Sequence, residues 1–297
     1  MKIALSILGL ALVSLINATA QVVTVQLMTE QDQFLPGESF PVTMHITNSS
    51  GQSLHLGADP KWLTFYVGSA DDSFGVMRKS DPPVTGEFDL GSSEVATKRL
   101  DLAPYFVMTH PGRYRATATV HIAEWNTDVA SPALQFDIID GVPLWSKDFG
   151  MPLPAGVTNQ QPVVRKFILE EANYLRKQLR MYVLVTDQPR SQVFKVSAIG
   201  PMVSFSRPEA QLDRASNLHV IYQSGAQSFL YSVVDPEGNI TLQEVYDYLG
   251  TRPRLAVNDA GDIVEQGGVR RVKPGEMPLV KAPDELPPAP APAPAKR

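Results

Sequence analysis

Apolar and polar residues alternate along much of residues 21–140, and this alternation limits the possible folds more than any other feature of the chain. The longest run places Tyr114, Ala116, Ala118, Val120 and Ile122 at every second position. Residues two apart in a strand lie on the same face of a sheet, so the run predicts a strand with one buried face. Several short strands at regular spacing favour a β-sandwich. Shorter alternating runs occupy residues 23–27, 42–46, 63–67 and 134–138.

A Pro-Gly turn leads directly into this longest run, two residues before Tyr114. The arrangement resembles the tyrosine corner of immunoglobulin-like domains, in which the hydroxyl donates a hydrogen bond to backbone a few residues upstream. The segments LPGESFPVTMHITNSSGQSL and HPGRYRATATVHI are similar to exported bacterial immunoglobulin-like modules. The resemblance implies an immunoglobulin-like β-sandwich over residues 21–149 and no particular activity. Because the chain contains no cysteine, this domain has to depend on its apolar core.

A second, small β-rich domain is expected over residues 162–272. Arg207-Pro208 and Arg252-Pro253 open two similar segments at an offset of 45 residues, and each predicts a strand, a turn rich in Asn, Asp or Gly, and another strand. Hairpins at this interval resemble β-propeller blades, but the segment is too short for four blades of about 40 residues. We therefore expect a compact mainly β domain of blade-like hairpins. Within residues 169–178, good helix formers leave a short helix as the alternative to strands.

The composition changes at the junction between the domains and again at the C-terminus. Residues 150–161 begin with a Pro- and Gly-rich stretch, which predicts a linker. Residues 21–154 carry 8 Lys and Arg against 16 Asp and Glu, whereas residues 155–273 carry 14 against 12. This difference supports two separate domains. Residues 273–297 end in PPAPAPAPAKR and predict a disordered Pro/Ala-rich tail.

Residues 1–20 have the pattern of a signal peptide. Lys2 is followed by an uncharged apolar stretch over residues 3–16, and Ala18-Thr19-Ala20 offers small residues at a cleavage site. We expect cleavage after Ala20, a periplasmic or extracellular location, and no membrane segment after cleavage. A cysteine-free exported chain fits a bacterial envelope better than an animal secreted protein.

Motifs with a known chemistry are missing from the sequence. It contains no G-x-S-x-G, H-E-x-x-H, Walker or dinucleotide-binding glycine motif. The histidines are expected to be solvated, and His45 and His121 to lie in opposite sheets, where they could not share a metal. The acidic turns at residues 235–239 and 258–262 lack the further ligands of a calcium loop and predict hairpin turns.

Two pairs of adjacent carboxylates, Asp71-Asp72 and Glu170-Glu171, were considered as acid–base pairs. Adjacent side chains on a strand point to opposite faces, so Glu170-Glu171 could not flank one bond. Both pairs are predicted to be solvated charges. We expect no catalytic residue, no metal, no cofactor and no enzymatic activity.

Surface aromatic and basic residues are the candidates for binding a ligand or partner. The formal net charge of -5 and pI near 5.6 argue against a nucleic-acid partner. The sequence predicts an exported, non-enzymatic binding or structural protein of the bacterial envelope, with an envelope protein or polysaccharide as its partner. The alternatives are a carbohydrate-binding accessory module and a secreted protease-inhibitor-like module that would use the loop at residues 69–92. The candidate residues are Trp125, Trp145, Tyr222, Tyr231, Arg252 and Arg254.

Overall fold

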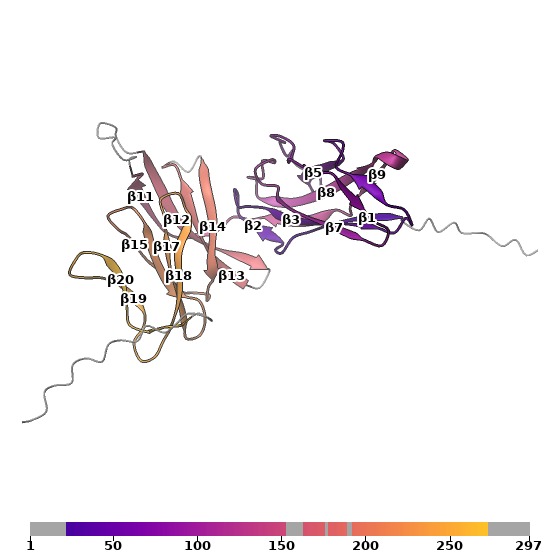
Figure 1. Ribbon diagram of the computed structural model, residues 1–297. Coiled ribbons are helices and arrows are strands. Elements are labelled where there is room, and N and C mark those ends of the chain that lie inside the picture. Colours follow the sequence, from indigo (N-terminus) through magenta and orange to yellow (C-terminus); the bar gives the residue numbers. More distant parts are fainter. Residues whose placement is uncertain (1–21, 153–162, 176–177, 189–191, 273–297) are drawn as a thin grey trace, which may run out of the picture. The chain divides into compact units, whose positions relative to one another are not determined.

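The computed structural model describes residues 22–152, 163–175, 178–188 and 192–272, and almost all of its regular structure is β (Figure 1). The chain divides into two compact units with the main boundary between Asp140 and Gly141, and a short stretch that includes Tyr174 is grouped with the first unit. The strand content confirms the prediction of a mainly β fold. No helix of the described part is both long and apolar enough to cross a membrane. The predicted signal peptide with its cleavage site and the predicted disordered tail lie outside the described residues.

The first unit is a sandwich of two main sheets around one apolar core. The pairing of the short strand β2 with β10 is parallel, and the other pairings in these sheets are antiparallel. Val25, Met44 and Phe65, from both sheets, contribute buried side chains, as expected for alternating strands. One sheet has the order β1 (Val23–Met28), β3 (Pro41–Asn48), β7 (Val95–Asp101); the other has β2 (Gln33–Phe34), β10 (Leu134–Ile138), β8 (Gly112–Ile122), β5 (Leu63–Ser69), with β9 (Thr127–Ala130) also on β8; β4 (Leu54–Leu56) pairs with β6 (Phe88–Leu90).

The tyrosine corner predicted at the start of β8 is present. The Tyr114 hydroxyl donates a hydrogen bond of 2.7 Å to the carbonyl oxygen of His110, and Tyr114 is 1% exposed. Its ring stacks on Phe136 and packs edge-on against Phe74. The corner therefore fixes the turn before β8 to the core of the unit. His45 on β3 and His121 on β8 lie in different sheets, as predicted.

The second unit is also built from two antiparallel sheets that share a core. Val183 from one sheet and Val220 from the other are both buried in that core. The hairpins are therefore layered face to face in one domain, and a separate two-stranded hairpin is added to them. The first sheet has the order β11 (Val142–Gly150), β12 (Val164–Leu175), β13 (Gln178–Thr186), β14 (Val193–Pro201); the second has β15 (Glu209–Leu212), β16 (Leu218–Gln223), β17 (Ser228–Val234), β18 (Ile240–Asp247), β21 (Val269–Arg270); β19 (Arg254–Val257) pairs with β20 (Ile263–Gln266).

The predicted boundary at residue 149 is wrong by about one strand. β11 belongs to the second unit and pairs antiparallel with β12 over its whole length, from Val142 with Glu171 to Gly150 with Val164. The Pro- and Gly-rich stretch at residues 150–161 thus connects two paired strands instead of two domains. A hairpin connection and a domain linker favour the same residue types, which explains the error. The helix considered at residues 169–178 is not formed, because β12 extends through Leu175.

The repeat predicted in the second unit consists of hairpins with one common turn. In the turn at residues 213–217, the Asp213 and Asn217 backbones pair, and Asp213 Oδ1 accepts from Asn217 N at 2.8 Å. The turns at 235–239 and 258–262 repeat this backbone pairing, with side-chain bonds of 2.7 and 2.8 Å. Gly238 and Gly261 take positive φ at the fourth position, where Ser216 does the same. The 45-residue offset therefore joins the first of these turns to the third, with the turn at 235–239 between them.

Candidate functional site

Two of the predicted binding residues, Arg252 and Arg254, line the same hollow on the second unit. The hollow has a volume of about 560 Å³ and is also lined by Glu209, Thr251, Gln266 and Gly267. Both arginines are exposed. The hairpin β19–β20 and the segment leading into it thus supply most of the hollow, and β15 supplies Glu209.

The hairpin register places the Arg254 guanidinium. Arg254 lies opposite Gln266 in the β19–β20 pair, and its Nη2 and Nε donate to Gln266 Oε1 at 2.9 and 3.3 Å. A cross-strand bond of this kind reduces the number of side-chain conformations that remain available. Arg254 is therefore held beside the hollow with its remaining N–H groups available.

A sharp turn after β20 lies against the backbone of Thr251 and Arg252. Gly267 and Gly268 both have positive φ, and Gly268 N donates to the Thr251 carbonyl at 3.1 Å. A Cβ on Gly267 would come within 2.8 Å of the Arg252 carbonyl oxygen, so only glycine fits there. The Arg252 guanidinium carbon lies 5.4 Å from the centre of the Phe229 ring, a cation–π contact.

Arg270 and Arg271, which follow the hairpin in the chain, each form an ion pair with a carboxylate of β18. Arg270 Nε donates to Glu244 Oε1 at 2.6 Å, and Arg271 Nε donates to Asp247 Oδ2 at 3.1 Å. The Arg271 contact lowers the pKa of the Asp247 carboxyl and raises that of the guanidinium. Lys273 lies outside the described residues.

Arg252 and Arg254 differ from these residues in their electrostatic surroundings. Within the described part of the chain, neither forms an ion pair with a carboxylate at 4.0 Å or less. Glu209 contributes one negative charge to the hollow, and its Oε2 accepts a hydrogen bond of 3.1 Å from Leu255 N. The hollow therefore keeps an excess of positive charge that is able to receive an anion.

Two of the four aromatic candidates are buried, and the other two are half-buried. Tyr222 is 1% exposed and lies in the core between the two sheets, and Tyr231 is 3% exposed. Tyr231 occupies the opposite face of its sheet, where Leu255 and Ile263 of the β19–β20 hairpin pack against it. The prediction that Tyr222 and Tyr231 lie on the surface is wrong, because both faces of this sheet are covered. Trp125 and Trp145 are half-buried against the cores of the first and second units respectively.

A buried polar contact under the hairpin was not anticipated. His219, predicted to be solvated, is 9% exposed, and its Nδ1 lies 2.7 Å from the Tyr231 hydroxyl. Its Nε2 lies 3.5 Å from Asp213 Oδ2. Burial, followed by the nearby carboxylates, raises the pKa of Tyr231 to about 12. The continuous apolar pattern of β16 and β17 was the signal in the sequence that both faces are buried.

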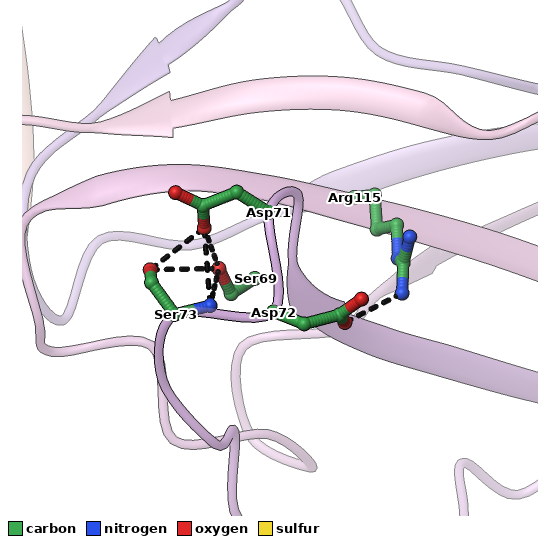
Figure 2. Close-up of polar contacts among 5 residues, drawn as sticks. All are labelled: Ser69, Asp71, Asp72, Ser73 and Arg115. Atoms are coloured by element: carbon green, nitrogen blue, oxygen red, sulfur yellow. Dashed lines mark hydrogen bonds and ion pairs between the residues drawn. The ribbon is translucent and has the colours of Figure 1, made fainter.

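The carboxylates of Asp71 and Asp72 are used in different contacts (Figure 2). Asp71 Oδ1 accepts from Ser69 Oγ at 2.5 Å and from Ser73 Oγ at 2.7 Å. These bonds lower the pKa of Asp71 to about 2. Asp72 instead accepts from Arg115 Nη2 at 2.7 Å. Asp71 therefore closes the turn after β5, and the two carboxylates are not arranged as an acid–base pair.

Comparison with known proteins adds no functional assignment. No protein-family model matches the chain, and no curated protein matches it. Among solved structures, the chain is similar to Spo0M, a sporulation control protein from Bacillus subtilis. The identity is 12%, the match covers 68% of this chain and 79% of that chain, and the TM-score is 0.29. A similarity at this level carries no argument about either fold or function.

Proposed function

We propose that the protein is an exported, non-enzymatic binding protein of the bacterial envelope that holds an anionic partner through Arg252 and Arg254. The location is inferred from the signal-peptide pattern of residues 1–20 and the lack of cysteine. The supporting observation for the binding role is that these two arginines line one hollow and form no ion pair with a carboxylate of the described residues.

An acidic polysaccharide is the partner that best suits this hollow. A guanidinium binds a carboxylate with two parallel hydrogen bonds, and two guanidiniums in one hollow match successive acidic groups of a polymer. A neutral glycan would instead be expected to stack on exposed Trp or Tyr rings. Tyr222 and Tyr231 are buried, so the neutral carbohydrate-binding alternative has lost two of the residues on which it depended.

Affinity electrophoresis of the full chain in gels containing polygalacturonate tests this function, with neutral dextran as the comparison polymer. Replacing both arginines, as R252Q/R254Q, should weaken polygalacturonate binding by at least about tenfold, since a hydrogen bond to a charged group contributes about 1.5–3 kcal/mol. The matched control is Arg99→Gln, which removes one exposed positive charge from the first unit and should leave binding unchanged.

Three outcomes would contradict the proposal. These are equal retardation of the wild-type protein by dextran, binding of the double variant equal to that of the wild type, and a loss of binding in Arg99→Gln as large as that in the double variant. Thermal unfolding of each variant shows that loss of binding is not loss of fold. Binding should also decrease with added salt, because surface charge interactions are screened.

A further inference from the structure

A second hollow, in the first unit, lies beside the edge strand β7 and has a volume of about 330 Å³. Its apolar lining comes from Met44 and Ile46 of β3, Ala96 of β7, Phe88 of β6 and Trp62. In the described residues, β7 pairs with β3 alone, and β6 pairs with β4 instead of with β7. The hollow therefore occupies the place where a further strand would otherwise close this side of the sandwich.

The wall that faces β7 is fixed by two glycines. A Cβ on Gly57 would come within 2.1 Å of the Gly86 carbonyl oxygen, so the two backbones approach as closely as glycine allows. Gly57 and Gly86 both have positive φ. Because this contact fixes the segment at residues 85–88, the hollow is part of the folded architecture.

Lys98 brings a positive charge into this hollow. It lies opposite Met44 in the β3–β7 register, so its side chain leaves β7 on the face that Met44 directs toward the core. Lys98 is half-buried, and its Nζ donates only a long hydrogen bond of 3.5 Å to the Thr85 carbonyl. In residues 22–152 it forms no ion pair at 4.0 Å or less with a carboxylate. Glu87 shares the hollow, but its carboxylate lies 3.8 Å from His55 Nε2 and is well exposed.

An inward-facing lysine also limits what the hollow is able to accept. A charged side chain on the core-facing side of an edge strand disfavours the addition of another strand, so an extended peptide is a poor occupant. The Lys98 ammonium, whose hydrogen bond to Thr85 is exposed, pairs with no carboxylate of the described residues, and it therefore favours a ligand that supplies a counter-ion. Trp62, which also lines the hollow, is 4% exposed, and its buried indole N–H has no hydrogen-bond partner among the described residues.

We propose that this hollow binds a small amphipathic carboxylate. Its apolar part lies against Met44, Ile46, Trp62 and Phe88, and its carboxylate pairs with Lys98. The volume is near the lower limit of small-molecule sites, about 300–1,000 Å³, which suits a medium-length chain and excludes a whole phospholipid.

Titration calorimetry of the full chain with octanoate, with octanol as its uncharged analogue, tests the proposal. Octanoate should bind at least tenfold more tightly than octanol. Lys98→Met, which keeps the apolar stem and removes the charge, should reduce octanoate affinity at least tenfold and leave octanol affinity unchanged. Arg99→Met is the matched control, because it removes the same charge from the opposite face of the same strand, and it should leave both affinities unchanged.

Each other outcome contradicts the proposal. Octanoate that fails to bind the folded wild-type protein at millimolar concentration would refute it, as would equal affinity for octanoate and octanol. Equal loss of octanoate binding in Lys98→Met and Arg99→Met would assign the effect to net charge instead of to this site. The R252Q/R254Q variant should bind octanoate normally, so the two sites succeed or fail independently.

Discussion

Replacing Tyr114 by phenylalanine isolates the contribution of one hydrogen bond to the first unit. The ring of Tyr114 is buried against Phe74 and Phe136, and phenylalanine keeps these contacts. The change removes only the hydroxyl that donates 2.7 Å to the His110 carbonyl. His110 is exposed and the bond is part-buried, so water replaces the lost donor, and the cost is that of an ordinary hydrogen bond, about 0.5–1.5 kcal/mol. The free energy of unfolding of this unit should therefore fall by about 0.5–1.5 kcal/mol.

The expected loss is large enough to measure by calorimetry. For a unit of this size, 1 kcal/mol corresponds to a change in melting temperature of about 3–6 °C. Differential scanning calorimetry of the full chain measures the change, and hydrogen exchange of the β8 amides assigns it to the first unit. Tyr66→Phe is the matched control, because Tyr66 is 53% exposed on β5 and its hydroxyl forms no hydrogen bond with any of the described residues. If Tyr114→Phe and Tyr66→Phe melt within 1 °C of each other, the tyrosine corner does not stabilise this unit as argued.

Three further predictions concern other contacts. Gly267→Ala should destabilise the second unit by about 1–3 kcal/mol and weaken polyanion binding, because a Cβ at this position of positive φ would collide with the backbone of Arg252. Urea unfolding and affinity electrophoresis measure the two effects. Gly225→Ala is the control and should change neither, because a Cβ there makes only ordinary contacts. Hydrogen bonds from Ser69 and Ser73 lower the pKa of Asp71 in the folded state from the usual 3.8 to about 2. The contribution of this carboxylate to stability is therefore complete above pH 3.8 and is lost as the pH falls toward 2. Asp71→Asn should make the urea midpoint of unfolding less dependent on pH in this range, and an unchanged dependence would contradict the argument. Tyr231→Phe should lower the free energy of unfolding by about 1–3 kcal/mol by leaving His219 Nδ1 without its partner, and a melting temperature equal to that of the wild type would show that the bond contributes nothing.

The local features of the fold were predictable from the sequence, whereas those that depend on distant segments were not. The alternation around Tyr114 predicted β8. The resemblance to a tyrosine corner implied a bond from the Tyr114 hydroxyl to backbone upstream, and the structure shows that His110 accepts it. The Asx/Gly pattern predicted the hairpins of the second unit, because side chains within five residues close those turns. The strand β11 was misassigned because its partner β12 lies beyond a Pro- and Gly-rich loop.

The candidate site shows the same division. Arg252 and Arg254 were chosen as surface residues, and the structure brings them to one hollow. What the sequence could not show is that Arg270 and Arg271 pair with carboxylates of β18, since this depends on how β21 lies beside that strand. The burial of Tyr231 likewise depends on the later hairpin β19–β20.

The β19–β20 hairpin has a consequence for how the gene can be shortened. It shields the rings of Phe229, Tyr231 and Tyr246 on the outer side of the five-stranded sheet. A chain ended near residue 250 would lose β21 from the five-stranded sheet and would expose this apolar face, and exposed apolar surfaces of this kind promote self-association. The hairpin β19–β20 thus keeps this face of the sheet out of solvent, and a shortened gene should still encode residues through 272.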